Sequence, residues 1–218
     1  MAIDYKTPYH WNVTGMSKEI QDECLHYACA CLNKNAKALD LGCGDGFFTH
    51  SMKLNGFSMV GVDVSQSGLR WAKLLSGNGI DYVRATGTLL PFRDEVFNEV
   101  ISFEVIEHVS KQKAALMVAE MWRVLKPRGA IIISTPNKKN IRNRIRHRQF
   151  TSAKHLYEYE IDELRELFAK FGEVEIIGLG IYLPIFGLTR WGRRFLIWLG
   201  KLLPFFSEKL IVIGEKRK

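Results

Sequence analysis

Short apolar runs alternate with amphipathic stretches along most of this chain. The runs are bounded by glycine or polar clusters and predict strands, whereas apolar residues at helical spacing predict helices between them. The predicted strands are residues 36–41, 57–62, 80–84, 99–103, 130–134, 174–177 and 210–213. The predicted helices are residues 17–32, 46–55, 65–76 and 111–125, with Ser17 capping the first. This alternation indicates an α/β fold with a mainly parallel sheet.

A glycine-rich turn follows the first predicted strand. Residues 36–47 read AKALDLGCGDGF, so an apolar run ends in Gly42-Cys43-Gly44-Asp45-Gly46. Glycines there let a ligand approach the backbone, and such a turn marks a nucleotide-type site in α/β proteins. Asp63 ends the second strand, about 20 residues further, where an acid binds the ribose hydroxyls of an adenosine ligand.

The turn favours S-adenosylmethionine (SAM) over a dinucleotide such as NAD. Phe47 occupies the position of the third glycine of the dinucleotide fingerprint. Asp40 and Asp45 place negative charge where a pyrophosphate would lie. SAM carries an ammonium, a carboxylate and a sulfonium but no phosphate, so its amino-acid end suits these acids.

Further motifs follow LDLGCGDG in a fixed order: VGVDVS, LLPF, FEVIEHV, RVLKPRG and STPN. The set resembles class I SAM-dependent methyltransferases, most closely the type-11 and ubiquinone-biosynthesis O-methyltransferase branch, over residues 36–178. The resemblance implies a Rossmann-like, doubly wound, seven-stranded sheet, mostly parallel with the last strand antiparallel. It also implies one methyltransferase domain over residues 1–218, with an N-terminal arm and helix (1–33) and a basic, apolar C-terminal lid insertion (about 179–206).

The same resemblance assigns a cofactor site. Asp40 is expected to face the methionine ammonium, Asp63 to bind the ribose, and Thr86 to border the adenine, where the family commonly has an Asp. Because threonine carries no charge, we expect a weaker or water-assisted contact with the adenine amino group. The expected cofactor-binding residues are Asp40, Gly42, Cys43, Gly44, Asp63, Val64, Thr86, Gly87, Phe103 and Glu104.

The expected catalytic residues are Glu104, Glu107 and His108. Methyl transfer from a sulfonium is an in-line displacement, so positioning and deprotonation of the acceptor carry the catalysis. His108 suits the role of proton acceptor, because the ordinary pKa of histidine lies near neutrality.

The ExxEH spacing of these residues also resembles the divalent-metal site of ubiquinone O-methyltransferases and small-RNA 2′-O-methyltransferases. His155 would complete a metal site with Glu104, Glu107 and His108. Two carboxylates and two imidazoles favour Mn²⁺ or Zn²⁺ over Mg²⁺, and a bound metal would lower the pKa of a substrate hydroxyl. A loop-organising role without metal remains open, since many type-11 relatives carry Glu-His here with no known metal.

Positive charge and a distinctive apolar stripe mark the later part of the chain. The formal net charge is +8, concentrated in residues 138–148 and 190–218, which favours an acidic substrate, nucleic acid or anionic lipid over a neutral partner. A solvated basic face is the simpler alternative. Aromatic residues do not interleave the basic ones in residues 136–150, which weakens the case for nucleic acid.

Within residues 187–206, apolar side chains recur at spacings of three and four and predict a helical stripe: Leu188, Trp191, Phe195, Trp198 and Leu202. The basic residues fall mostly off this stripe. It could pack on the sheet or on a second copy, or lie on an anionic membrane as a lid that admits a hydrophobic acceptor. Residues 1–16 do not resemble a signal peptide and no apolar run spans a membrane, so we expect a cytoplasmic protein with peripheral membrane contact through residues 187–206.

Together these patterns predict methyl transfer from SAM to a hydroxyl of a small or lipid-like molecule, with S-adenosylhomocysteine as the product. Two alternatives remain open. The basic charge and the ExxEH motif favour an RNA 2′-O-methyltransferase, and a catalytically inactive SAM-binding accessory protein would need only the cofactor site.

Overall fold

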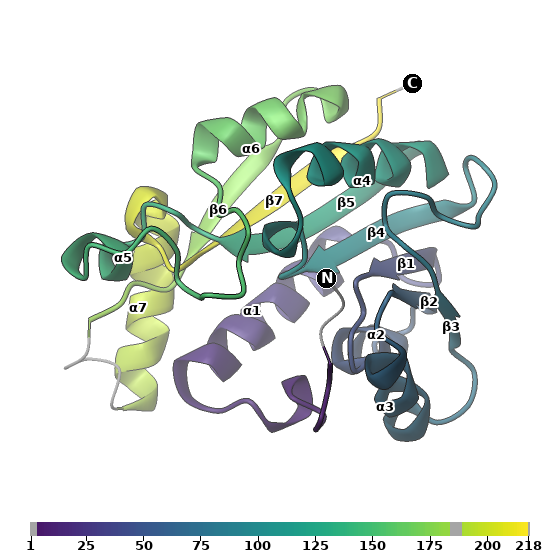
Figure 1. Cartoon of the computed structure of the whole chain (residues 1–218), viewed down its shortest axis with the longest axis horizontal. Helices are drawn as coiled ribbons and strands as arrows, with labels where there is room; N and C mark the ends of the chain where they lie inside the picture. Colours follow the sequence, from purple (N-terminus) through teal and green to yellow (C-terminus); the bar gives the residue numbers. More distant parts are fainter. Residues whose placement is uncertain (1–3, 184–188, 218) are drawn as a thin grey trace.

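The computed structural model describes residues 4–183 and 189–217 (Figure 1). Its strands are β1 (Lys37–Leu41), β2 (Ser58–Asp63), β3 (Asp81–Arg84), β4 (Phe97–Phe103), β5 (Leu125–Pro136), β6 (Glu175–Leu179) and β7 (Lys209–Glu215). The α-helices are α1 (Gly15–Cys31), α2 (Phe47–Leu54), α3 (Gln66–Ser76), α4 (Lys111–Val124), α5 (Ile141–Ile145), α6 (Ile161–Leu167) and α7 (Arg190–Leu202). The short 3₁₀ turns are η1 (His10–Asn12), η2 (Ile106–His108), η3 (Ala169–Phe171) and η5 (Pro204–Phe206).

The strands form one seven-stranded sheet in the order β3-β2-β1-β4-β5-β7-β6. The pairs from β3 to β5 are parallel, and β7 runs antiparallel to both β5 and β6. The predicted sheet, mostly parallel with an antiparallel last strand, is confirmed. The chain moves from β1 to one edge and returns to β4 on the other side of β1. This reversal opens a crevice at the carboxyl ends of β1 and β4, where ligands of such folds bind.

Two hydrophobic layers hold helices against the two faces of the sheet. In β1, Leu39 and Leu41 pack into the layer of α4 and α6, whereas Ala38 joins the layer of α1, α2 and α7. Figure 1 shows α4 and α6 on one side of the sheet and α1, α2, α3 and α7 on the other. Successive side chains of a strand point to opposite faces of the sheet. Because both faces are covered by helices, both sets of side chains are apolar, which accounts for the near-continuous apolar runs in the sequence.

Two boundary predictions are wrong. The first helix begins at Gly15 with Thr14 as its N-cap, so Ser17 lies inside the helix rather than capping it. The strand predicted over residues 130–134 begins earlier, at Leu125, and a register shift opposite Phe97 and Glu99 absorbs the extra residues. A bulge accommodates Pro127 and Gly129 without ending the strand, as bulges do in other sheets.

Helix α7 turns its apolar stripe away from the sheet. Leu196 and Ile197 are buried, whereas Trp191 is 83% exposed and Trp198 is 53% exposed. Helix α7 therefore packs on β6, as one alternative predicted, but through Leu196 and Ile197 rather than through the stripe. Leu188 lies outside the described residues. None of the helices in residues 4–183 and 189–217 combines the length and hydrophobicity needed to cross a membrane.

Candidate functional site

The glycine turn joins the ends of β1 and β2. The main-chain nitrogens of Gly42 and Cys43 donate to the carbonyl oxygen of Val62 at 2.7 and 3.0 Å. Gly42 and Gly44 have φ angles of +81° and +51°, which favour glycine. The Asp63 carboxylate accepts the main-chain N–H of Gly44 at 2.9 Å, and burial raises its pKa. Asp63 thus lies directly against the turn, as the sequence predicts.

Asp40 lies beneath the same turn. It is 2% exposed, and Thr49 Oγ1 donates to its Oδ2 atom at 2.6 Å. Burial raises the pKa of Asp40 to about 7. A cationic group near this buried carboxyl would stabilise its charged form, which fits the ammonium of SAM.

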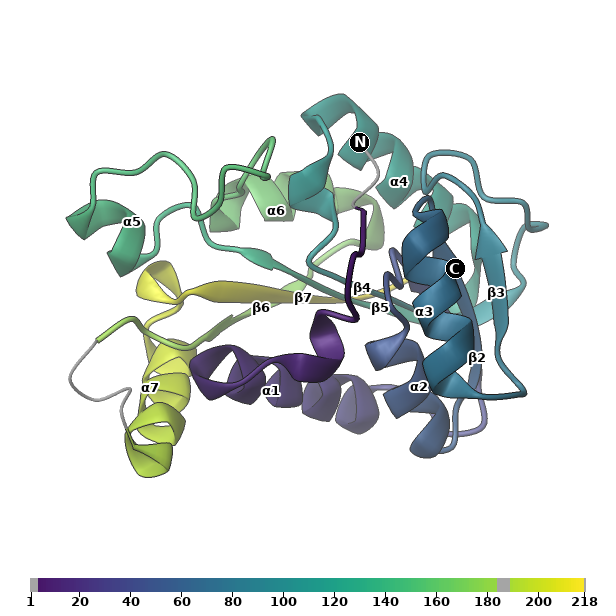
Figure 2. The ribbon, with the colours of Figure 1, turned by 60° about the horizontal axis from the view of Figure 1, so that its bottom comes forward.

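An N-terminal arm, residues 4–14, covers the turn (Figure 2). Asp45 is fully buried, and its carboxylate accepts the main-chain N–H of His10 at 2.7 Å and contacts His10 Nδ1 at 2.9 Å. The carbonyl oxygen of Asp45 accepts the Trp11 indole N–H at 3.0 Å. The Tyr5 ring lies over Gly44, so closely that an added Cβ would collide with its hydroxyl. Asp45 therefore holds the arm rather than facing a ligand.

The residues expected around the adenine follow β2 and β3. Val64 is 40% exposed, and Thr86 is exposed with its hydroxyl 2.9 Å from that of Thr88. A Cβ on Gly87 would meet the Met117 side chain at 2.9 Å. An open groove of about 330 Å³ runs beside Val64 and is lined by Asp4, Val64, Ser65, Gln66, Ser67, Arg70 and Arg84. The glycine turn does not line this groove, because the arm covers the turn.

Phe103 and Glu104 end β4 beside the turn. Phe103 is buried and packs on Phe48 with ring centroids 4.6 Å apart. Glu104 adopts a φ of +59°, its Oε1 atom accepts from the Ser134 hydroxyl at 3.0 Å, and its Oε2 atom pairs with Lys209. This left-handed backbone, strained for a residue with a side chain, directs Glu104 toward β7.

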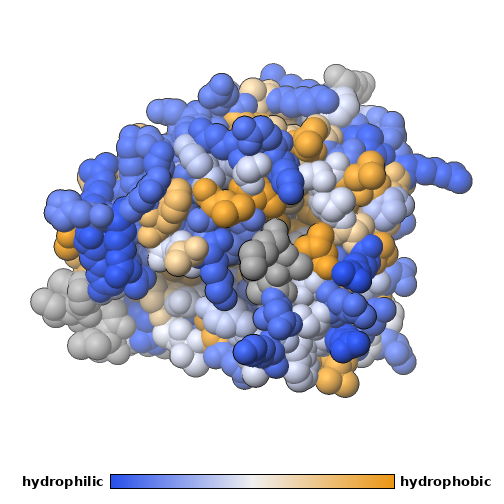
Figure 3. Space-filling view, viewed as in Figure 1, coloured by the Kyte–Doolittle hydropathy of each residue, from blue (hydrophilic) through white to orange (hydrophobic). Residues whose placement is uncertain are grey.

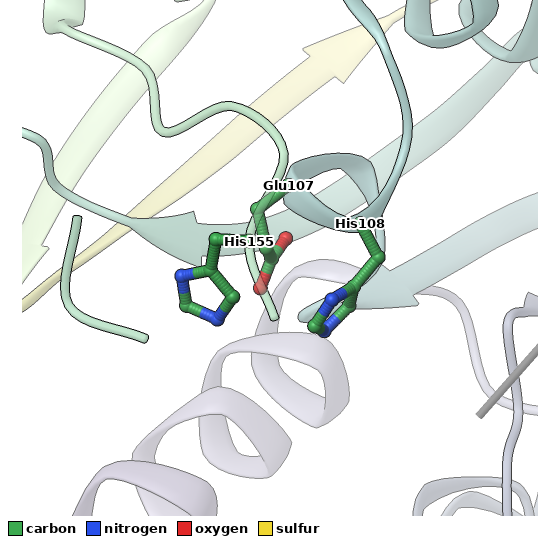
Figure 4. A group of neighbouring side chains, drawn as sticks. All are labelled: Glu107, His108 and His155. Atoms are coloured by element: carbon green, nitrogen blue, oxygen red, sulfur yellow. The ribbon is translucent and has the colours of Figure 1, made fainter. Parts of the chain in front are cut away.

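Glu107, His108 and His155 come together beside this strand end (Figure 4). Each offers a ligand atom, and these atoms lie within 4.8 Å of one another. Glu107 and His108 belong to η2, and His155 lies in the loop before α6. The structure thus brings together three of the four predicted metal ligands, while Glu104 stands apart with Lys209.

Hydrogen bonds fix both imidazoles of this cluster. His155 Nδ1 lies 2.5 Å from Glu158 Oε1, and His108 Nδ1 lies 3.2 Å from the carbonyl oxygen of Lys154. Because a carbonyl only accepts, Nδ1 of His108 carries a proton, and its Nε2 keeps a lone pair. Burial lowers the pKa of His108, so the ring is neutral at neutral pH. A carboxylate behind a histidine, as at His155, is a frequent arrangement around metals.

Glu107 is the buried acid of the cluster. It is fully buried, and its Oε2 atom accepts from the Thr135 hydroxyl at 3.2 Å. Its Oε1 atom has no hydrogen-bond partner within the described part of the chain. Burial raises the pKa of Glu107 to about 8. An unpartnered carboxylate oxygen beside two imidazoles fits a cation, because burying it alone is unfavourable.

This burial predicts a pH-dependent stability gain for Glu107→Gln. The pKa is raised on folding, so the stability linked to this acid is complete below its ordinary pKa and is lost as the pH rises to about 8. Since glutamine does not ionise, the melting temperature should exceed that of the wild type by several degrees at pH 8.5 and by little at pH 5. Thermal melts followed by circular dichroism, with chelator present, measure the difference. Glu166→Gln, on the exposed side of α6, is the matched control. A lower melting temperature at pH 8.5 would contradict the expectation.

The sequence interpretation missed Glu158 and Lys209. The spacing of three residues between His155 and Glu158 was an available signal, although such pairs are common on surfaces. Glu158 is fully buried and also accepts from the main chain of Thr151 and the amide of Asn143. Lys209 is 105 residues from Glu104 in sequence, so no local pattern predicts their pairing.

Comparisons with known proteins point to one kind of domain. Residues 39–133 match the family described as "Methyltransferase domain". The chain is 33% identical over 105 residues to a "Ubiquinone biosynthesis O-methyltransferase" of Bartonella bacilliformis, covering 47% of this chain and 42% of that protein. The chain therefore spans less than half the length of this curated relative.

Two solved structures share the fold. A SAM-dependent methyltransferase from Archaeoglobus fulgidus superposes with a TM-score of 0.69 at 17% identity, covering 91% of this chain and 94% of that one. Phosphoethanolamine N-methyltransferase 2 of Haemonchus contortus, in complex with SAM, gives a TM-score of 0.67 at 17% identity, covering 97% of this chain and 56% of that one. At these identities the likeness concerns the fold alone.

Proposed function

The chain carries a class I SAM-dependent methyltransferase domain, and from this premise we propose that it transfers a methyl group from SAM to a hydroxyl of a small or lipid-like acceptor. The observation that carries the proposal is the pairing of β1 with β4. The glycine turn follows β1, and Glu107 and His108 follow β4 with His155 beside them, so the proposed cofactor site and the proposed proton acceptor would lie at one edge of the sheet.

The residues at the turn have roles that suit SAM. Bound SAM would supply an electrophilic methyl group on its sulfonium. Asp40 would face the ammonium, Asp63 the ribose hydroxyls, and the main chain of residues 42–44 would form the floor. Val64, Thr86 and Gly87 would border the adenine. Asp40 is buried and Asp63 is half-buried, and burial raises the pKa of both, which makes a cationic and a hydroxylated partner favourable there.

His108 is the proposed base. Its neutral imidazole keeps a lone pair on Nε2 and can accept the proton of the acceptor hydroxyl as the oxygen–methyl bond forms and the sulfur–methyl bond breaks. Glu107 would stabilise the resulting imidazolium. Glu104 stands further off, and through its pairing with Lys209 it would shape the acceptor side of the site.

A divalent cation would fit the same cluster. Glu107, His108 and His155 present one carboxylate and two imidazoles, a donor set that favours Zn²⁺ or Mn²⁺ and leaves positions for an acceptor oxygen. The Glu158 carboxylate, which contacts His155 Nδ1, supports a metal-binding role for the cluster.

We expect chelator-treated protein to bind one Mn²⁺ per chain, read by electron paramagnetic resonance titration without SAM or acceptor. His155→Ala should weaken binding at least tenfold, because it removes one of three ligands. His147→Ala, which changes an exposed histidine after α5, is the control and should leave binding unchanged. If Mn²⁺ and Zn²⁺ both fail to bind the wild type, His108 acts without metal.

An acceptor screen tests the function. Protein, SAM and a panel of phenols, polyprenylated phenols and short RNAs are incubated, and S-adenosylhomocysteine is followed by mass spectrometry. Turnover with a hydroxylated small or lipid-like molecule supports the proposal. Turnover with RNA alone would favour 2′-O-methylation, which the basic residues 138–148 would support by binding the RNA backbone. SAM binding without turnover on any acceptor would indicate an accessory protein.

A further inference from the structure

The end of the molecule carrying α5, α7 and η5 gathers exposed apolar side chains. Figures 1 and 2 show α5 and α7 at the same end of the sheet, and the Arg144 guanidinium of α5 lies over the Phe206 ring of η5 at 5.1 Å. We call this end the α5–α7 surface. Its exposed apolar residues are Ile145, Trp191, Phe195, Trp198, Leu202, Leu203, Phe205 and Phe206.

Helix α7 has one buried face and one face that exposes two tryptophans. Leu196 and Ile197 are buried, and Gly200 approaches the Gly180 backbone so closely that a Cβ would collide with it. Trp191 and Trp198 lie two turns apart on the opposite, exposed face. The helix is thus anchored on β6 by one face and presents large apolar side chains with the other.

The surface is also strongly basic. The sequence has no acidic residue from Ile176 to Ser207 or from Pro136 to Tyr157. Arg193 and Lys201 pair with acids of α1, at the side of the helix. Among the described residues, no carboxylate lies within ion-pair distance of the exposed Arg144, Arg148 and Arg194. Figure 3 shows hydrophilic side chains gathered over α5.

We propose that the α5–α7 surface docks on an anionic phospholipid bilayer. Tryptophan and phenylalanine partition into the interface between head groups and acyl chains, and the neighbouring arginines bind the anionic head groups. Because Arg144 stacks on Phe206, the positive charge and the apolar ring would lie at the same depth in the bilayer interface. A nucleic acid would match the charge but not the exposed aliphatic residues Ile145 and Leu202.

The surface is joined to the acceptor side of the site. The Asn137 amide, directly after β5, donates to the carbonyl oxygens of Pro204 and Phe205 at 3.1 and 3.2 Å. Residue 209, which begins β7 a few residues later, pairs with Glu104. Docking would therefore bring the acceptor side close to the bilayer. The docking proposal does not depend on the proposed acceptor, since lipid binding can be measured without turnover.

Vesicle sedimentation tests the proposal with the full chain. We expect binding to vesicles of equal parts phosphatidylglycerol and phosphatidylcholine, together with a blue shift of tryptophan fluorescence, and at least tenfold weaker binding to phosphatidylcholine alone. The double variant Trp191→Ser, Trp198→Ser should bind anionic vesicles at least tenfold less. The variant Arg144→Gln, Arg148→Gln, Arg194→Gln should lose the salt-sensitive part of the binding.

Matched controls separate docking from folding. Leu54→Ser and Leu116→Ser remove exposed apolar side chains on α2 and α4, and should leave vesicle binding unchanged. The circular dichroism spectrum and the SAM affinity should be the same for all variants. Vesicle binding is measured without turnover, so the docking result stands even if the protein transfers no methyl group. Equal binding to both vesicles, or none, overturns the proposal. A dimer in light scattering that the tryptophan variant disrupts, without vesicle binding, would assign the surface to a second copy and also overturn it.

Discussion

Asp63→Ala is expected to weaken SAM binding at least about 100-fold. A carboxylate that accepts hydrogen bonds from two ribose hydroxyls supplies roughly 1.5–3 kcal/mol per charged hydrogen bond, and each 1.4 kcal/mol is a factor of ten in affinity. Asp63 also accepts the Gly44 N–H, so the substitution loosens the floor of the proposed site as well. Isothermal titration calorimetry with SAM and with S-adenosylhomocysteine measures both affinities.

Two measurements make this result specific. Asp81→Ala, an exposed acid at the start of β3, is the matched control and should bind SAM as the wild type does. The loss of the hydrogen bonds to the turn should also lower the melting temperature of Asp63→Ala by a few degrees, so titration is done well below it. If the variant is folded and its SAM affinity is unchanged, Asp63 does not bind the ribose.

The sequence predicts the strands near the glycine turn to within one or two residues. β1 and β2 are buried on both faces, so their apolar runs are sharply bounded by polar residues and glycine. β5 is less well predicted, because its first residues, Leu125 to Gly129, contain a proline and a glycine that usually end an element. Pairing with β4 overrides that local preference.

The orientation of α7 could not be predicted from its pattern. A periodic stripe fixes which residues share a face, but not whether that face is turned toward the core. Here the close contact of Gly200 with Gly180 decides the packing, and it buries Leu196 and Ile197 instead of the larger aromatics. Glycine contacts of this kind depend on the partner strand, which lies 20 residues away in sequence.

The cofactor turn and the histidine cluster differ in how far sequence can predict them. Motif order alone places Asp63 beside Gly44, and the structure has them in contact. The ExxEH resemblance grouped Glu104 with Glu107, but η2 begins only at Ile106, Glu104 has a φ of +59°, and its carboxylate pairs with Lys209 instead. An isolated left-handed residue leaves no periodic signal in the sequence.

His108→Ala should lower the rate of methyl transfer by a factor of 10² to 10⁴, the usual contribution of a positioned base, while SAM affinity stays the same. Wild-type kcat should fall as the pH drops below the pKa of His108, which burial lowers, because protonation removes the lone pair of Nε2. The variant should lose this dependence on pH. His147→Ala, an exposed histidine after α5, serves as the control and should retain the wild-type rate and pH profile.

Added imidazole distinguishes the two proposed roles of the cluster. If His108 acts as a base, imidazole enters the space left by alanine and restores part of the rate in chelator-treated protein. If His108 acts mainly as a metal ligand, rescue requires Mn²⁺ or Zn²⁺ as well, and the wild type loses its activity when chelated. A His108→Ala enzyme with the wild-type rate and pH profile would exclude both roles. Glu107 and His155 would then serve only to hold η2 against the loop before α6. The main-chain N–H groups of Leu156 and Tyr157 already join these two segments, because both donate to the Glu107 carbonyl oxygen.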